Sequence, residues 1–121
     1  MRMWMGADPK FMCRQHLLGE HRELHALMVM ITANVSLGGF IKKDLIEPSS
    51  IWTRHEEIIL EMHRRGYRHK TPLYVNRFYF VMAMQREQNN VWWLHKVDVK
   101  KSLKELLYRC IACKKLQVKT C

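Results

Sequence analysis

Apolar residues at helical spacing in the first third of the chain constrain its fold most. Intervals of three, four and seven residues place them on one face of an α-helix, where they can be buried together. An Asp-Pro pair at 8–9 suits the start of that helix, and a Gly pair at 38–39 suits its end. One long first helix is therefore predicted. Its buried stripe comprises Leu17, Leu24, Leu27, Met28, Ile31 and Val35.

Two more helices are predicted further along the chain. The first follows a Pro-Ser-Ser segment at 48–50 and ends at Gly66, and the second begins with Asp98 as its N-cap. Residues 67–72 have the composition of a basic loop, whereas residues 73–85 fit either a strand or a helix. The last helix is expected to carry Leu103, Leu106, Leu107 and Cys110.

Length and composition indicate a single globular domain. A chain of 121 residues is too short for two independent cores, so one domain is expected to cover residues 1–121. Hydrophobic residues (48%) and charged residues (26%) are close to globular averages, which excludes general disorder. No apolar run reaches the roughly 18–20 residues of a membrane span. We expect a mostly α, compact domain of three main helices with long loops, monomeric, cytoplasmic and not bound to membranes.

The basic residues are concentrated in the second half of the chain. The formal net charge is +10, yet residues 1–61 hold 7 basic and 8 acidic side chains, whereas residues 62–121 hold 14 basic and 3 acidic ones. One basic half is typical of a protein that binds the phosphate backbone of nucleic acids. A solubilising surface is the alternative interpretation.

The opposite face of the first helix carries polar residues at positions three and four apart. His16, Gly19, Arg22, Glu23 and Ala26 lie together on this face. Glycine inside a helix costs about 1 kcal/mol relative to alanine, so either a ligand approaches there or the helix packs closely. A carboxylate beside a fixed cation can move a proton or stabilise a developing positive charge. The alternative is an ordinary solvated helix face.

Four cysteines leave a metal site open as a possibility. Cys110-x-x-Cys113, followed by Cys121, could supply three thiolates to zinc, with a histidine or Cys13 as the fourth ligand. Reduced structural thiols are the alternative in an intracellular protein. His55 and His63 fall two turns apart on one face of the second helix, which indicates a helix surface.

Two adjacent tryptophans also have two interpretations. Trp92 and Trp93 lie beside His95 and Lys96, and such aromatic–basic pairs can stack on unpaired bases or wedge into a duplex. They are equally typical of side chains that anchor a core.

Three sequence blocks follow one another along the first part of the chain. The first is Gln15-His16-Leu17-x-x-Glu20-x-Arg22-Glu23-Leu24, the second is Pro48-Ser49 and the third is Arg64-Arg65-Gly66-Tyr67. In this order they resemble the pyrimidine dimer DNA glycosylases of the T-even phage endonuclease V type. The resemblance covers residues 1 to about 73. It implies a compact, mostly helical fold and, as substrate, double-stranded DNA containing UV lesions or abasic sites.

The resemblance also implies a mechanism and its residues. The free α-amine at the N-terminus attacks the anomeric carbon of the sugar, an imine (Schiff base) forms, and β-elimination cuts the strand. The essential carboxylate falls on Glu23, and the amine belongs to Met1, or to Arg2 if Met1 is removed. Neither a metal nor an organic cofactor is used. An α-amine has a reference pKa of about 7.7–8.0, so a useful fraction is neutral at pH 7.

DNA contacts are expected from two groups of residues. The resemblance assigns Gln15, His16 and Arg22 to DNA binding. The basic cluster around Gly66 is expected to hold the phosphate backbone. Two alternatives remain at this point, a non-catalytic DNA-binding domain and a related enzyme that acts on another modified base. The cluster comprises Arg64, Arg65, Arg68 and Lys70.

Overall fold

The computed structural model describes residues 1–69, 72–73, 76–85 and 89–118. This part of the chain contains six α-helices, three short 3-10 turns and no strand, which confirms the mostly α fold. The three longest helices correspond to the three that were predicted, and the ambiguous region after residue 73 contains a short helix. The helices are α1 (Arg14–Thr32), α2 (Gly38–Lys42), α3 (Ile51–Arg64), α4 (Arg77–Met84), α5 (Val99–Arg109) and α6 (Ile111–Val118).

The first helix begins later than the Asp-Pro pair predicts. Asp8 caps only a single 3-10 turn, Pro9–Phe11, by accepting a hydrogen bond from the amide of Lys10. Met12 and Cys13 are then extended, with ψ angles of 141° and 160°, and this interrupts the helical path. The start at residues 8–9 is therefore wrong, and α1 begins at Arg14.

The first helix also ends earlier than the glycine pair predicts. Asn34 adopts a left-handed conformation with φ 57°, and the amide of Val35 bonds the carbonyl of Met30 at 2.9 Å. This is the hydrogen-bond pattern of a Schellman motif, in which asparagine can replace glycine. The helix thus stops at Thr32, and the glycines at 38–39 begin α2 instead. Val35 lies outside the buried stripe and is 44% exposed.

The boundaries of the later helices agree better with the sequence. Gly66 follows the end of α3 with φ +82°, as predicted for a terminating glycine. Asp98 is the N-cap of α5 and accepts a hydrogen bond from the amide of Lys101. Cys110, however, is not part of this helix. It is extended, with φ −128° and ψ 107°, and separates α5 from α6.

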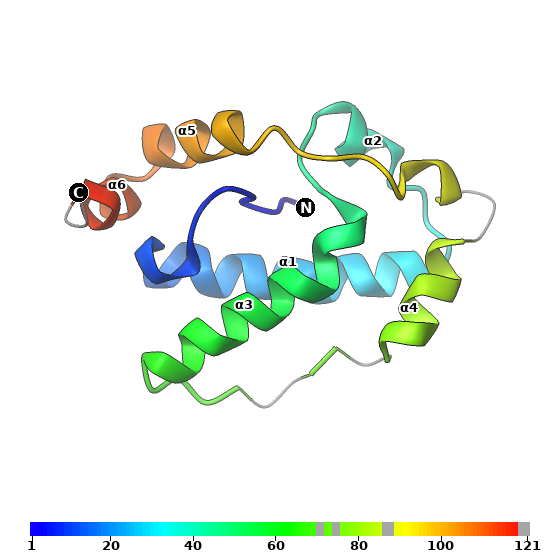
Figure 1. Cartoon of the computed structure of the whole chain (residues 1–121), viewed down its shortest axis with the longest axis horizontal. Coiled ribbons are helices and arrows are strands. Elements are labelled where there is room, and N and C mark those ends of the chain that lie inside the picture. The colour runs from blue at the N-terminus through cyan, green and yellow to red at the C-terminus, as the bar shows by residue number, and fades with distance from the viewer. Residues whose placement is uncertain (70–71, 74–75, 86–88, 119–121) are drawn as a thin grey trace.

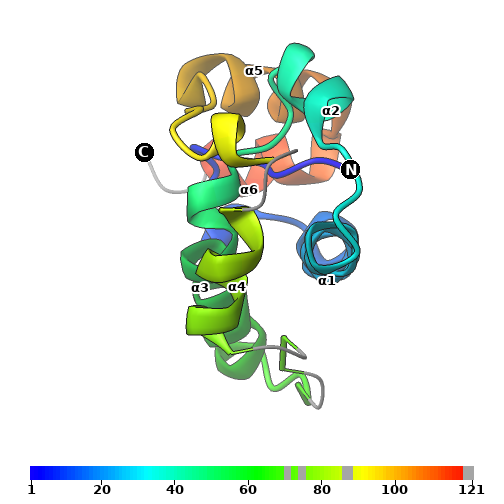
Figure 2. The ribbon, with the colours of Figure 1, turned by 90° about the vertical axis from the view of Figure 1, so that its right-hand side faces the viewer.

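The N-terminal segment is enclosed by the helices. Figures 1 and 2 show α3 crossing α1, with the first residues of the chain running between α1 and α5. The last helix, α6, returns to the 3-10 turn that precedes α1. No helix in the described part of the chain is both long and apolar enough to span a bilayer. The core is built from side chains of nearly every element, including Met3, Leu17, Leu24, Met28, Ile51, Ile58, Phe80, Met84, Leu106 and Cys113.

Candidate active site

Alternate amides of the N-terminal segment donate to two carboxylates of α1. The amide of Arg2 lies 3.0 Å from Oε2 of Glu23, and the amide of Trp4 lies 3.1 Å from Oε1 of Glu20. The two glutamates are three residues apart, so they share a helix face. The amide of the intervening Met3 donates in another direction, to a carbonyl of the loop between α2 and α3 at 2.9 Å. The segment is therefore held from two sides, with its first residues beside Glu23.

Glu20 is held in turn by a buried arginine of α3. The Nε and Nη2 atoms of Arg54 donate to the two carboxylate oxygens of Glu20 at 2.6 and 3.0 Å. Nη1 of the same guanidinium donates to the carbonyl of Ala7 at 2.8 Å. Because all three nitrogens have partners, Arg54 links α3 to α1 and to the N-terminal segment at once.

A cleft of about 640 Å³ lies beside the N-terminus. Gly19 contributes to its wall, and a Cβ atom added there would meet nothing within 4 Å. Close helix packing is thus excluded as the reason for this glycine, and the backbone of α1 is open to a ligand. The structure brings together six of the predicted site residues in the lining of this cleft: Met1, Arg2, Gln15, His16, Arg22 and Glu23.

Basic side chains share the lining of the cleft with the Glu23 carboxylate, for which the described residues provide no ion-pair partner. Arg22 is exposed, and Lys43 and Arg109 complete the lining. The guanidinium of Arg2 stacks on the ring of Trp4 at 4.0 Å, and burial together with the nearby Arg109 lowers the pKa of Arg2. Such a cleft attracts an anionic group such as a phosphate, and its carboxylate can accept a proton or stabilise a cation.

The basic cluster around Gly66 lies outside this cleft. The guanidinium of Arg65 donates to Glu61 at 2.6 Å and to the carbonyls of Pro9 and Met12 at 3.0 and 2.6 Å, so it joins α3 to the turn before α1.

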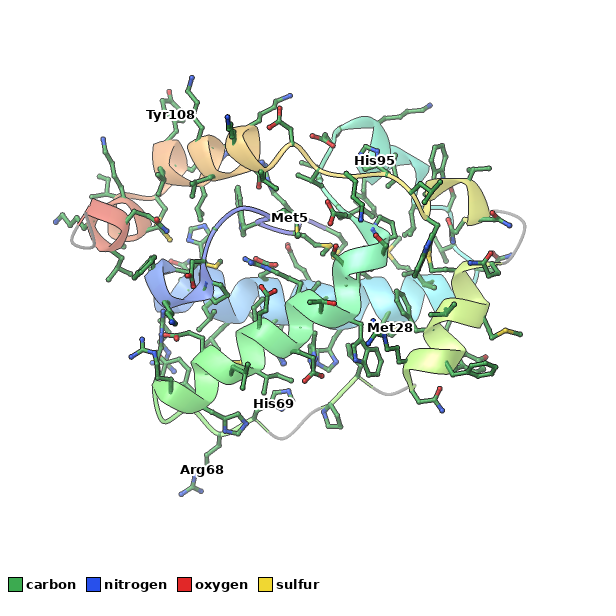
Figure 3. All side chains as sticks on the ribbon, in the orientation of Figure 1. Met5, Met28, Arg68, His69, His95 and Tyr108 are labelled. Carbon is green, nitrogen blue, oxygen red and sulfur yellow. The ribbon has the colours of Figure 1, made fainter. Side chains whose placement is uncertain are left out.

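Arg64 and Arg68 have different surroundings. Arg64 shares the buried carboxylate of Glu61 with Arg65, although 59% of the Arg64 side chain is exposed. Hydrogen bonds from Arg64 and Arg65 lower the pKa of Glu61. Arg68 is exposed and projects away from the molecule beyond the end of α3 (Figure 3). Lys70 lies outside the described residues.

A profile of the pyrimidine dimer DNA glycosylase family matches residues 1–75, which is more than half of the chain. The chain belongs to this family. No curated protein and no solved structure matches it. Membership identifies a DNA glycosylase with DNA as its substrate. The matched region includes the N-terminal segment, α1 and the loop that follows α2, which together supply all the lining of the cleft except Arg109.

Three residues that line or support the cleft were not identified from the sequence. Arg109 lines the cleft from α5, outside the matched region, and only the fold brings it there. Glu20 belongs to the first family block, but its partner Arg54 is 34 residues away in sequence. Trp4 offers no sequence signal beyond being an aromatic residue near the N-terminus.

The two adjacent tryptophans pack against the core. The ring of Trp93 lies 5.9 Å from that of Phe80, and both tryptophans are partly buried. The side chain of Trp92 lies close to Gly38, where an added Cβ would be 3.6 Å from its ring. These contacts favour the interpretation as core anchors over base stacking.

Three cysteines and one histidine form a cluster where α6 meets the start of α1. The four ligand atoms of Cys13, His16, Cys110 and Cys113 lie within 4.8 Å of one another. Burial raises the pKa of the Cys113 thiol well above its ordinary value. The sequence left open a set with Cys121 and a histidine or Cys13, and the structure brings both Cys13 and His16 to Cys110 and Cys113. Cys121 itself lies outside the described residues.

Four histidines form a second cluster between α1, α3 and the segment after α3. His21, His25, His55 and His69 each present a ring nitrogen, and these atoms lie within 4.8 Å of one another. The surface position predicted for His55 is wrong, since this side chain is only 1% exposed. Burial, followed by repulsion from the neighbouring histidines, lowers the pKa of His21 to about 4 and that of His55 to about 3. The rings of His21 and His55 are therefore neutral at pH 7.

Proposed function

We propose that this protein excises cyclobutane pyrimidine dimers from duplex DNA and then cuts the strand as an AP lyase. The α-amine of the N-terminal residue attacks C1′ of the deoxyribose that carries the damaged base. The glycosidic bond breaks with its electron pair moving to the base, which takes up a proton. The sugar ring then opens as the C1′–O4′ bond breaks and O4′ is protonated, so that an imine joins the protein to the sugar. Loss of a proton from C2′ and expulsion of the 3′-phosphate complete the β-elimination.

The hydrogen bond between Arg2 and Glu23 carries this proposal. It holds the first residues of the chain at the Glu23 carboxylate in the lining of a basic cleft. In the proposed reaction Glu23 accepts the proton released when the amine attacks. Its negative charge then stabilises the cationic iminium form of the intermediate.

The position of this hydrogen bond also bears on which α-amine is the nucleophile, that of Met1 or that of Arg2 after removal of Met1. The nitrogen beside Glu23 belongs to Arg2 and is an amide nitrogen while Met1 is attached. Removal of Met1 would convert this same nitrogen into the free α-amine, 3.0 Å from the carboxylate. With Met1 retained, the amine is one residue farther along the segment, and the nucleotide must reach it at the cleft mouth.

The size of the cleft supports extrusion of a nucleotide. A volume of about 640 Å³ is in the range of small-molecule sites and admits a nucleotide rather than a duplex. A nucleotide must therefore leave the stack to reach the amine, as in other enzymes that act on bases or sugars in duplex DNA. Arg22, Lys43 and Arg109 at the cleft are placed to hold the flanking phosphates.

Borohydride trapping on a duplex with one abasic site tests the chemistry without requiring the correct lesion. Reduction of the imine should join protein and DNA covalently, and mass spectrometry of the joined peptide should locate the bond at the N-terminal residue. Selective reductive methylation of the α-amine should abolish trapping. A bond at a lysine, or trapping that survives methylation, would contradict the proposed nucleophile.

Two proteins with different first residues distinguish Met1 from Arg2. One begins at Met1 and the other, released from a cleavable fusion, begins at Arg2. We expect the second to be trapped at least as fast, because its amine lies at Glu23. If neither protein is trapped while both bind the duplex, the chain is a non-catalytic DNA-binding domain and the proposal fails. Excision from a duplex with one cyclobutane dimer, compared with an undamaged duplex, then tests the lesion.

A further inference from the structure

The cluster at the start of α1 has the composition and dimensions of a closed zinc site. We propose that Cys13, His16, Cys110 and Cys113 bind one Zn²⁺ ion that joins the end of the chain to the start of α1. Three sulfur ligands and one imidazole are a common set for structural zinc. The ligands come as two pairs, each with two intervening residues, and each pair lies at the beginning of a helix. This inference is independent of the proposed reaction.

The distances between ligand atoms agree with tetrahedral coordination. Zn–S bonds of about 2.3 Å and Zn–N bonds of about 2.0 Å require S···S separations of about 3.8 Å and S···N separations of about 3.5 Å. The Sγ atoms of Cys13 and Cys110 are 3.7 Å apart. Nδ1 of His16 lies 3.3 Å from Sγ of Cys13 and 3.8 Å from Sγ of Cys113. The cluster therefore surrounds a space of the size of the ion.

Backbone amides support the sulfur atoms in the way that outer-shell groups support metal ligands. The amide of Cys13 donates to Sγ of Cys113 at 3.2 Å, and the amide of Cys113 donates to Sγ of Cys110 at 3.4 Å. Such hydrogen bonds orient ligands and stabilise thiolate charge. A disulfide does not account for the arrangement, because 3.7 Å is far longer than an S–S bond of about 2.05 Å.

A zinc ion bound by these four residues would fix the positions of side chains that line the cleft. Arg109 directly precedes the ligand Cys110, so fixing Cys110 fixes the cation that α5 contributes to the lining. On the other side, the ring of His16 contacts the edge of Trp4, on which Arg2 stacks. The ion thus connects the part of the chain beyond the family match to the residues that hold the N-terminus. His16 acts through its Nδ1 atom as a ligand, in place of the direct DNA contact that the resemblance implies.

The second cluster, formed by His21, His25, His55 and His69, supports an independent inference. Its four imidazoles form a site for one divalent transition-metal ion. Nε2 of His55 lies 3.2 Å from Nε2 of His25, close to the N···N edge of about 3.3 Å in a tetrahedral site. The Nε2 atoms of His21 and His69 are buried and have no hydrogen-bond partner among the described residues, and the His21 residue is only 8% exposed. Buried polar atoms are rarely left unpaired. Neutral imidazoles suit zinc, copper, nickel and iron.

Metal analysis of the full chain tests both sites. The protein is purified under reducing conditions without chelator and measured by inductively coupled plasma mass spectrometry. We expect two metal ions per chain, one of them zinc. Cys113→Ser should lose the zinc and retain the other ion, and His25→Asn should do the reverse. His63→Asn, which changes a histidine outside the two clusters, should keep both ions.

Cobalt replacement provides a measurement that does not depend on the folding of variants. Co²⁺ in the cysteine site should give thiolate-to-cobalt charge-transfer absorption and strong tetrahedral bands in the unmodified protein. Binding should release protons, because the three thiols must ionise. A reduced wild-type protein without zinc and without thiolate–cobalt absorption would overturn the zinc site, as would a native disulfide that includes Cys13 or Cys110. The same metal content in the wild type and in His25→Asn would overturn the histidine site.

Discussion

Glu20 and Arg54 form a buried ion pair beneath the N-terminal segment, with two hydrogen bonds of 2.6 and 3.0 Å. The side chain of Glu20 is fully buried, and that of Arg54 is 4% exposed. The same carboxylate accepts the amide of Trp4. The pair therefore sets the path of the residues that lead to the cleft, although neither member is a candidate for the chemistry.

Removing Arg54 should destabilise the fold strongly. Arg54→Met keeps the volume of the side chain but leaves the Glu20 carboxylate buried without its partner, which typically costs about 3–5 kcal/mol. Urea unfolding at pH 7 measures the loss. Arg68→Ala is the control, because this exposed side chain should change stability by less than about 0.5 kcal/mol. Equal stability of the two variants would show that the pair does not support the N-terminal segment.

Glu23→Gln should bind DNA and fail to cut it. Glutamine keeps the shape and can still accept the amide of Arg2, but it has neither the charge nor the basicity of the carboxylate. A catalytic acid or base contributes roughly 10²–10⁴-fold, so single-turnover strand cleavage should fall by that factor. Glu56→Gln, an exposed change on α3, should cleave at the wild-type rate. Cleavage near that rate by Glu23→Gln would leave Glu23 without a catalytic role.

Gly19→Leu should abolish activity without lowering the stability of the fold. Leucine is a better helix former than glycine by nearly 1 kcal/mol, and a Cβ atom added at this position meets no neighbouring atom within 4 Å. The melting temperature should therefore not fall, whereas the side chain should occupy the cleft and block borohydride trapping. Gly39→Leu, also in open space but outside the cleft, should be trapped normally. Normal trapping of Gly19→Leu would place the nucleotide elsewhere.

DNA affinity should depend steeply on salt, and Arg22 should contribute to the dependence. Each lost phosphate contact lowers the slope of log K against log salt by about 0.9. Arg22→Ala should lower it by about that amount for damaged and undamaged duplexes alike. The same result is expected for Arg68→Ala, which is exposed beyond α3. An effect of Arg22→Ala on damaged DNA alone would mean that this side chain contacts the lesion.

The stabilising effect of Glu61 should disappear in acid. Hydrogen bonds from Arg64 and Arg65 hold the pKa of Glu61 below its ordinary value. Its stabilisation is therefore complete well above the unfolded value of about 4.3 and is lost as the pH falls through the folded value. Glu61→Gln should be less stable than wild type by about 1–3 kcal/mol at pH 7. Urea unfolding from pH 7 to pH 3 should show this difference shrinking, whereas Glu56→Gln should show none.

Local rules predicted much of the fold because the decisive residues are close in sequence. The apolar stripe of α1, the cap at Asp98 and the stop at Gly66 each depend on a few neighbouring residues. Two helix boundaries were predicted wrongly because a different nearby residue set the backbone conformation. Asn34 adopted the left-handed conformation that the glycine pair was expected to supply, and Cys110 interrupted a helix whose pattern continued through it.

The candidate active site was only partly predictable, because some of its residues are distant in sequence and meet only in the folded protein. Arg22 and Glu23 lie on one exposed helix face, so spacing and the family resemblance were enough to select them. The partners of Glu20 and of His16 come from segments that only the tertiary fold brings near. Sequence did contain weaker signals: His21 and His25 are one helical turn apart, and Cys13-x-x-His16 has the spacing of a ligand pair. Neither spacing reveals which distant residues complete the cluster.

The contact between Cys13 and Cys110 has a consequence for folding during synthesis of the protein. These residues are 97 positions apart, and translation proceeds at about 5–20 residues per second. Cys13 is therefore synthesised roughly 5–20 s before Cys110, and during that interval α1 has neither α5 nor α6 beside it. A ribosome that stalls after the end of the family match but before position 109 leaves a nascent chain that contains Glu23 but lacks Arg109 at the cleft. Only chains that extend through Arg109 can assemble the full lining of the cleft, so termination before that residue yields fragments without it.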